Sequence, residues 1–126
     1  MSSVMITPLK KASENDRGAN FGLKTRMRDD YMVIFRKKGT VNGNHYHLGK
    51  NPVKNPEVIV FLSGEALFEW REPASGEPAR AELKAPAKIE VWPNVWHRLT
   101  AKTDIVFMEE GYLKPEEYEE ETVRVD

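Results

Sequence analysis

The stretch GTVNGNHYHLGKNPVKNPEVIVFLSG, residues 39–64, carries the pattern that decides the fold. His45 and His47 lie two residues apart among strand-forming residues, so their side chains should point to the same face of a strand. After nine intervening residues, Glu57 precedes Val58–Leu62, an apolar run typical of a buried strand. The stretch therefore predicts two strands that carry two imidazoles and one carboxylate.

Short segments rich in β-branched and aromatic residues recur around this stretch, with Gly, Asn and Pro between them. The predicted strands are Tyr31–Arg36, Asn44–Leu48, Val58–Leu62, Ala66–Arg71, Ala79–Lys84, Lys88–Trp92, Val95–Ala101 and Asp104–Glu109. Glu116–Glu120 can form a helical turn, and residues 121–125 can add an edge strand or exchange with a partner. Strands at this spacing predict an all-β sandwich or barrel.

The beginning of the chain differs from the rest. Residues 13–20 are polar and turn-rich, so residues 1–20 are expected to be an N-terminal arm that docks loosely or wraps a neighbour. Residues 21–126 are predicted to form a single β-barrel domain, since a chain of 126 residues can bury one core. The arm also favours a homodimer.

The composition argues against several classes of partner. Nineteen Lys and Arg against twenty Asp and Glu give a net charge of -1, so no overall field attracts nucleic acid or an anionic membrane. No segment reaches the roughly 18 apolar residues of a membrane span. The absence of cysteine leaves imidazole and carboxylate as the strong metal ligands. We therefore expect a cytoplasmic protein that binds a small molecule.

A third imidazole completes a candidate metal site. His97 lies in another predicted strand, fifty residues after His47. If the two strands are neighbours, the three imidazoles form a facial set of nitrogen donors that borderline divalent metals prefer. A buried carboxylate without a partner is costly, so Glu57 is expected to be the fourth ligand. The alternative for Glu57 is an ion pair with Lys54 or Lys50 at the mouth of the loop.

These residues resemble the two motifs of the cupin family. In the first motif, Gly is followed after five residues by His-any-His, then by Glu and, after six more, by Gly. This spacing is met by Gly39, His45, His47, Glu57 and Gly64. The second motif, Pro-any-Gly-any-any-His, is similar to residues 92–97, with Asn94 at the turn glycine, a residue that tolerates a left-handed backbone. The nine-residue gap before Glu57 is longer than the family's usual three or four, so a loop is inserted near the site.

The resemblance implies a cupin-type double-stranded β-helix, a jelly-roll barrel, with one divalent ion (Fe, Mn, Ni or Zn) bound by His45, His47, Glu57 and His97. Residues 43–47 also resemble the cupin domains of bacterial capsule and nucleotide-sugar enzymes. The leading hypothesis is a metal-dependent enzyme of isomerase or epimerase type that acts on a small carbonyl or sugar-like metabolite. An iron-dependent dioxygenase and a non-catalytic metabolite-sensing cupin are the alternatives, because a ligand set alone does not select the reaction.

Overall fold

The protein is described by a computed structural model that covers residues 3–26, 28–72 and 76–125. The strands are β1 (Val4–Pro8), β2 (Lys10–Asn15), β3 (Gly18–Gly22), β4 (Tyr31–Arg36), β5 (Val41–His47), β6 (Glu57–Ser63), β7 (Glu65–Arg71), β8 (Pro78–Lys84), β9 (Ala87–Val91), β10 (Trp96–Ala101), β11 (Ile105–Glu110) and β12 (Thr122–Arg124). The helical elements are the 3-10 helix η1 (Pro52–Lys54) and α1 (Pro115–Glu121).

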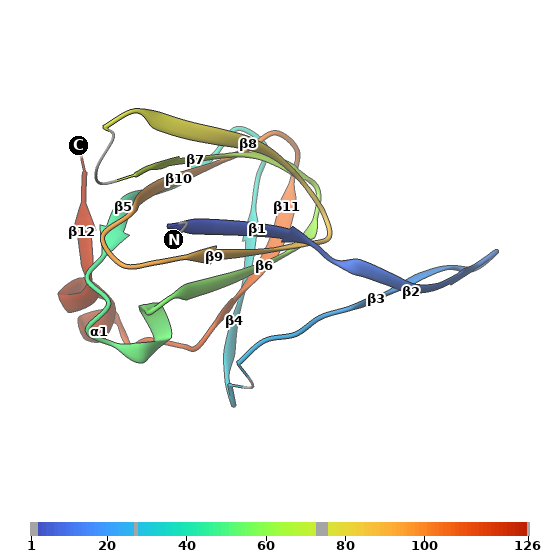
Figure 1. The fold of residues 1–126 in the computed structure, drawn as a ribbon, viewed down its shortest axis with the longest axis horizontal. Coiled ribbons are helices and arrows are strands. Elements are labelled where there is room, and N and C mark those ends of the chain that lie inside the picture. Colours follow the sequence, from blue (N-terminus) through green and yellow to red (C-terminus); the bar gives the residue numbers. More distant parts are fainter. Residues whose placement is uncertain (1–2, 27, 73–75, 126) are drawn as a thin grey trace.

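Two five-stranded antiparallel sheets form a jelly-roll barrel (Figure 1). The strand order is β1-β9-β6-β11-β4 in the first sheet and β12-β5-β10-β7-β8 in the second. The predicted all-β jelly roll is therefore confirmed.

The predicted elements agree closely with the observed ones. Each of the eight predicted strands matches one observed strand, with ends that differ by at most three residues. The expected helical turn lies within α1, and the expected edge strand is β12, which pairs with β5. Among the described residues, none of the helical segments has the length and apolar character that crossing a membrane requires.

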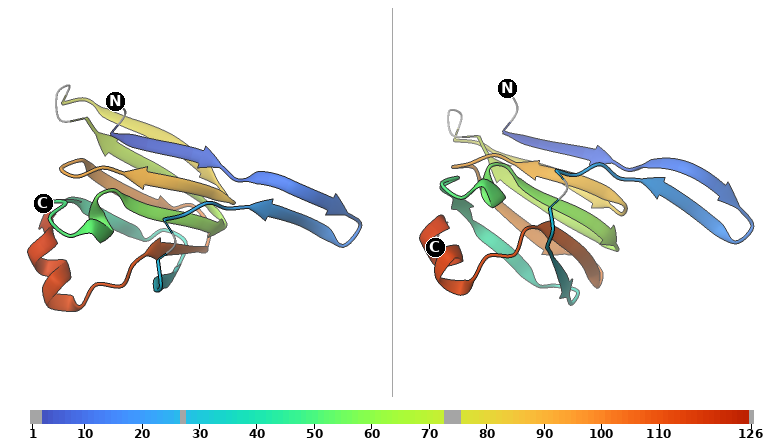
Figure 2. Two further views of the ribbon diagram at one scale, coloured as in Figure 1. Left: turned by 60° about the horizontal axis from the view of Figure 1, so that its bottom comes forward. Right: turned by 90° about the horizontal axis from the view of Figure 1, so that it is seen from below.

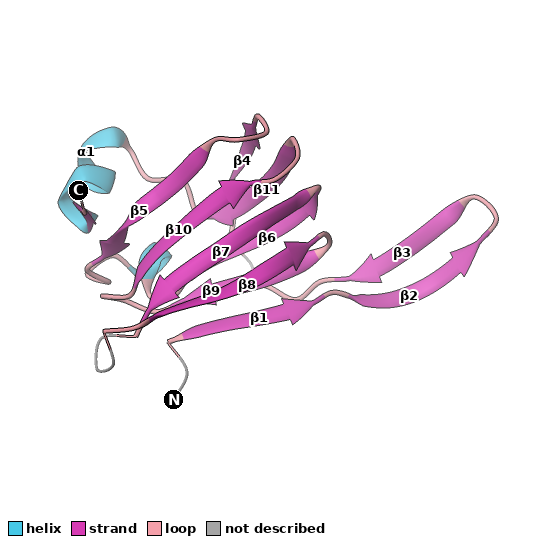
Figure 3. Cartoon of the chain, turned by 90° about the horizontal axis from the view of Figure 1, so that it is seen from above, coloured by secondary structure: helices cyan, strands magenta, loops and turns pink. Residues whose placement is uncertain are grey.

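The N-terminal segment divides into two parts. β1 pairs with β9, with Val4 opposite Val91, so the barrel sheet starts earlier than expected from the sequence. β2 and β3 form a hairpin that projects away from the barrel and is exposed along both strands (Figures 2 and 3). Residues 1 and 2 of the expected arm and residue 126 of the expected domain lie outside the described residues.

The core lies between the two sheets. Inward residues of both sheets form one buried cluster that includes Phe61, Phe68, Leu83, Ile89 and Ile105. In β10, buried positions alternate with partly exposed ones, as expected for a strand with one face turned to the core. The same alternation turns His97 toward the interior.

Phe61→Ala is expected to lower the free energy of unfolding by about 3–5 kcal/mol, because it removes a buried ring from the core. Phe35→Ala is the matched control, since Phe35 is 70% exposed and Phe61 is 0% exposed. It should change the free energy of unfolding by less than about 0.5 kcal/mol. Urea denaturation measures both values, and equal losses would contradict this placement of the core.

Candidate metal centre

β5 and β10 bring the three histidines together. The two strands are antiparallel neighbours in which His45 lies opposite His97, and His47 shares the inward face of His45. The ring centroids of His45 lie 4.5 Å from His47 and 4.8 Å from His97. One nitrogen atom from each ring lies within 4.8 Å of the others, and all three residues are buried. That these atoms hold a metal remains a prediction.

A local irregularity in β5 permits this approach. Gly43 has φ 88° and Asn44 has φ 59°, and the register between β5 and β10 shifts directly after His97. A side chain at Gly43 would place its Cβ 3.0 Å from the carbonyl oxygen of His97. Glycine therefore allows the close backbone contact, and the bulge turns the following residues of β5 toward the cluster.

The turn before β10 is tied to β5. Asn94 has φ 66°, in the left-handed region that we expected Asn to tolerate there. Its backbone N–H donates to the carbonyl oxygen of His47 at 2.7 Å. This hydrogen bond fixes the position from which His97 enters the sheet relative to His47.

Each imidazole is held by its Nδ1 atom from outside the cluster. The partners are the Val95 carbonyl oxygen at 3.0 Å for His97, the Thr122 hydroxyl at 3.1 Å for His47, and the Tyr118 hydroxyl at 3.5 Å for His45. Metal-binding histidines are commonly oriented in this way, through the ring nitrogen that does not contact the metal. Nε2 of His47 and His97 faces Glu57 instead.

Glu57 lies beside the histidines at the start of β6 and is 3% exposed. Its Oε1 atom is 3.1 Å from Nε2 of His97, and its Oε2 atom is 3.4 Å from Nε2 of His47. Despite these short distances, Oε1 of Glu57 and Nε2 of His47 make no hydrogen bond of good geometry within the described part of the chain, although both atoms are buried. Such atoms are costly in an interior, and a cation between them would satisfy both. The donor set therefore fits a divalent ion.

The inserted loop directs Lys54 into the interior. Asn51 caps η1 by accepting a hydrogen bond from the Val53 backbone N–H at 3.0 Å. Lys54 is 3% exposed, and its Nζ atom lies 2.7 Å from Oε2 of Glu57 and 3.3 Å from Oε1 of Glu109. The alternative considered for Glu57, an ion pair with Lys54, is thus present in the structure. The pair lies inside the barrel, where β11 contributes a second carboxylate to it.

The charges of this pair stabilise each other. Burial disfavours the carboxylate form of Glu57, but Lys54 and then His47 outweigh it and hold the pKa of Glu57 well below its ordinary value. Burial likewise opposes the ammonium form of Lys54, but Glu57 and Glu109 outweigh it and raise the pKa of Lys54. Burial and the charge of Glu57 raise the pKa of Glu109. Lys54 and Glu57 are therefore both charged at neutral pH.

The pKa values of two of the histidines shift in opposite directions. Burial, followed by the charges of His97 and His47, lowers the pKa of His45 to about 3. His45 is therefore neutral at neutral pH, the form in which an imidazole binds metal. Burial opposes the charged form of His97 too, but Glu57 outweighs it and raises the pKa of His97. A divalent ion that bound here would compete with protons for His97.

Sequence reasoning did not assign Glu109 and Tyr118 to the site. The Tyr118 ring lies 6.3 Å from the ring of His45 and 5.9 Å from that of His47. Burial and the charge of Glu57 raise the pKa of the Tyr118 hydroxyl. For Glu109 a signal was available, because this carboxylate directly follows the apolar run of residues 105–108 and would be buried with it. Tyr118 gave none, because its position depends on how α1 docks.

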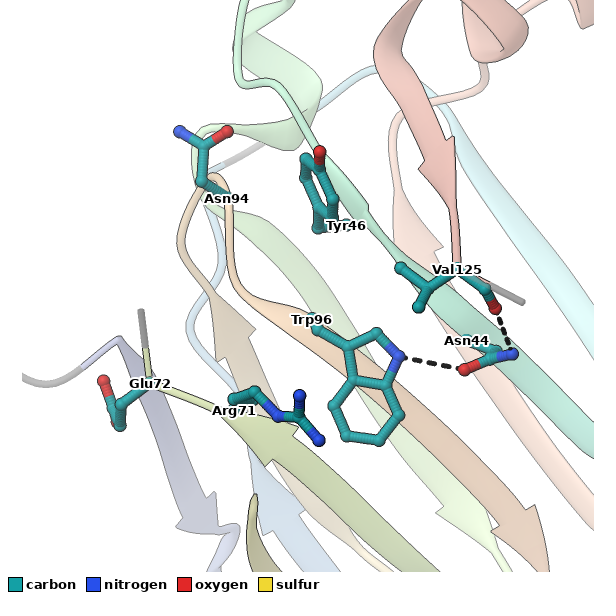
Figure 4. Close-up of a pocket in the computed structure, with 7 residues that line it drawn as sticks. All are labelled: Asn44, Tyr46, Arg71, Glu72, Asn94, Trp96 and Val125. Carbon is teal, nitrogen blue, oxygen red and sulfur yellow. Dashed lines mark hydrogen bonds between the residues drawn. The ribbon is translucent and has the colours of Figure 1, made fainter. Parts of the chain in front are cut away.

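Two cavities lie on opposite faces of β5 and β10. The inner cavity, about 50 Å³, is lined by His45, His97, Glu57 and Glu109 together with apolar core residues. The outer cavity, about 300 Å³, is lined by residues that include Tyr46 and Trp96 (Figure 4). The outer cavity is larger, but the histidines and Glu57 do not line it. We therefore place the candidate site at the inner cavity.

No protein-family model matches the sequence, and no curated protein matches it either. Solved structures do resemble this chain. The QdtA 3,4-ketoisomerase of Thermoanaerobacterium thermosaccharolyticum, in a variant bound to TDP, has a TM-score of 0.72 and 18% identity, over 99% of this chain and 89% of that one. This chain has the cupin-type jelly-roll fold.

Two further structures share this cupin-type fold. ChmJ, a 3'-monoepimerase from Streptomyces bikiniensis bound to dTDP-quinovose, has a TM-score of 0.77 and 13% identity, over 98% of this chain and 70% of that one. The capsular polysaccharide assembling protein CapF from Staphylococcus aureus has a TM-score of 0.62 and 22% identity, over 94% of this chain and 34% of that one. At these identities the likeness establishes the fold.

In the metal-free protein, the His45 ring is expected to stay neutral from about pH 8 to pH 5, because its pKa is lowered to about 3. His97 should instead titrate above the ordinary histidine value of about 6.5, because Glu57 stabilises its charged form. Imidazole NMR resonances as a function of pH measure both, with His45→Gln for assignment. An unshifted midpoint for His45 would contradict the buried cluster.

Proposed function

We propose that this chain is a metal-dependent isomerase or epimerase that acts on a small carbonyl or sugar-like substrate. The observation that carries the proposal is the approach of three buried imidazoles to one another beside the buried Glu57 carboxylate, whose Oε1 atom lies 3.1 Å from Nε2 of His97 without a well-formed hydrogen bond. The similar fold of a 3,4-ketoisomerase and a 3'-monoepimerase, solved with TDP and dTDP-quinovose, supports the choice of reaction and substrate.

In this proposal one divalent ion is held by His45, His47, His97 and Glu57. The ligand set is compatible with Fe, Mn, Ni or Zn. When bound, such an ion polarises a substrate carbonyl and so favours loss of a proton from the neighbouring carbon.

Two other side chains can move the proton. An isomerase of this kind needs one group that accepts a proton from carbon and another that returns one. Glu109 lines the inner cavity, and its raised pKa brings it closer to the value that proton transfer at neutral pH requires. The Tyr118 hydroxyl lies 3.5 Å from Nδ1 of His45, and its raised pKa keeps it protonated as a donor.

Substrate entry requires a movement near the C-terminus. The inner cavity of about 50 Å³ is smaller than the roughly 300–1,000 Å³ of typical small-molecule sites. Tyr118, on α1, lies against the histidines. β12, which follows α1 directly, has three residues and pairs with β5 alone among the described strands. Tyr118 and Thr122 contact His45 and His47 without lining the inner cavity, so in this proposal displacement of α1 and β12 uncovers the histidines for a sugar.

An iron-dependent dioxygenase is the second candidate function. The observation that favours it is the size and lining of the inner cavity, which is small and bordered by apolar side chains such as Ile59, Phe68, Leu99 and Phe107. Such a space suits a small apolar molecule such as dioxygen better than a sugar. A metabolite-sensing role is the non-catalytic reading of the same site.

We also propose that the chain forms a homodimer through the β2–β3 hairpin. Both strands are exposed along their whole length, and the hairpin projects from the barrel. Isolated two-stranded hairpins are marginally stable in water. A second copy of the chain would cover this hairpin.

Protein purified without a histidine tag or chelating resin is expected to contain one divalent ion per chain. His47→Ala should lose most of it, because each removed ligand weakens a four-ligand site. Tyr46→Phe is the control, since Tyr46 lines the outer cavity. Elemental analysis measures the metal content, and a full complement in His47→Ala would remove His47 from the ligand set.

The wild-type protein is expected to introduce deuterium from D2O beside the carbonyl of TDP-4-keto-6-deoxyglucose, as measured by mass spectrometry. Glu109→Gln should slow this exchange by about 10²-fold or more, because it removes the proton acceptor. Glu69→Gln is the control, because Glu69 pairs with Arg98 at 3.0 Å on the face of the second sheet opposite the histidines. Oxygen consumption with bound iron would instead favour the dioxygenase, and binding without exchange the sensor.

A further inference from the structure

A protein cation already lies within the candidate metal centre. The Lys54 ammonium is shared by two carboxylates, at 2.7 Å from Glu57 and 3.3 Å from Glu109. The Glu57 oxygen that it contacts is also 3.4 Å from Nε2 of His47. One carboxylate therefore links the ammonium to the histidine cluster, and a single ammonium group contacts two carboxylates in the interior.

The loop that carries Lys54 is anchored on the outer side of the first sheet. Glu109 and Glu110 are neighbours on β11 and point to opposite faces, so Glu109 contacts Lys54 while the buried Glu110 binds Arg26. Arg26 donates to Glu110 from Nε at 2.8 Å and from its backbone N–H at 3.0 Å.

The same guanidinium also reaches η1. It donates to the carbonyl oxygens of Pro52 at 3.1 Å and Val53 at 3.3 Å, the two residues before Lys54. Gly111, directly after β11, lies so close that an added Cβ would be 2.6 Å from Cγ1 of Val53. These contacts hold the backbone at Lys54 against β11, so the inward position of the ammonium is built into the fold.

We propose that Lys54 competes with the divalent ion for Glu57 and thereby lowers the affinity of the site for metal. This inference rests on the proposed function, because it requires that the histidines bind an ion. The ammonium occupies Oε2 of Glu57 and leaves Oε1 to the ion. It also repels a second cation, since like charges a few ångströms apart in an interior disfavour each other. In the metal-free protein the ammonium supplies the positive charge that the buried carboxylates need.

Arg26 is a positioning residue in this arrangement. It lies outside the histidine cluster and contacts Glu110 and the backbone of η1. Loss of its guanidinium would release the backbone next to Lys54 and leave every proposed ligand in place. Its effect on metal affinity should therefore have the same direction as the loss of Lys54 and a smaller size.

The test is Zn²⁺ binding by Lys54→Met, measured by competition with a chromogenic chelator at neutral pH. The variant is expected to bind Zn²⁺ at least about tenfold more tightly than the wild type, because a neighbouring charge typically changes the cation affinity of a buried group by one to three powers of ten. Its melting temperature should be lower than that of the wild type without Zn²⁺ and should rise more when Zn²⁺ is added.

Lys102→Met is the matched control. Lys102 also pairs with a glutamate at 2.7 Å, but Lys102 is 51% exposed and its partner Glu82 is 59% exposed. Its Zn²⁺ affinity should equal that of the wild type. Lys54→Arg keeps the positive charge and should remain close to the wild-type affinity.

The outcomes separate this inference from the proposed metal site. Wild-type Zn²⁺ binding with equal or weaker binding by Lys54→Met would overturn the competition and leave the metal site intact. If Lys54→Met does not fold with or without Zn²⁺, the Zn²⁺ affinity of Arg26→Gln tests the inference instead. An affinity equal to or weaker than that of the wild type overturns it. Absence of Zn²⁺ binding in the wild type and in both variants would overturn the metal site and the competition together.

Discussion

The antiparallel pairing of β5 with β10 is the constraint on which the candidate site depends. It places His45 opposite His97, although the two lie 52 positions apart in the chain. The bulge at Gly43 and the hydrogen bond from Asn94 to His47 then adjust the two strands at the point where the imidazoles meet. A shift of either strand by one residue would turn its histidines to the outer face. The register of one strand pair therefore decides whether the chain has a site at all.

The inserted loop gives this barrel a particular electrostatic character. In a site of three imidazoles and one carboxylate, the charge of a bound ion is usually the largest one present. Here Lys54 lies beside Glu57, and Arg26 fixes the loop from outside, so a positive charge is present whether or not an ion is bound. The insertion thus does more than lengthen a surface turn, because it adds a charged residue to the interior.

Much of the fold and part of the site could be predicted from sequence. Runs of β-branched and aromatic residues between Gly, Asn and Pro located the eight strands, and the spacing of His45, His47 and His97 predicted that the three would meet. The pairing of β1 with β9 was missed, because the short apolar stretch of residues 4–6 does not indicate which strand it pairs with. Whether Glu57 contacts Lys54 or an ion, and whether Tyr118 covers the histidines, depends on loop and helix docking, for which local sequence carries no signal.

The C-terminal segment supports the histidines from outside the inner cavity. Thr122 contacts Nδ1 of His47, the Glu121 carbonyl accepts from the Leu48 backbone N–H at 2.9 Å, and the Arg124 guanidinium lies 5.9 Å from the Tyr118 ring centre. The barrel core does not use these residues. Separation of this segment from β5 would therefore release the His47 ring from Thr122 while the rest of the barrel stayed packed, so the order of one imidazole depends on a part of the chain that adds nothing to the core.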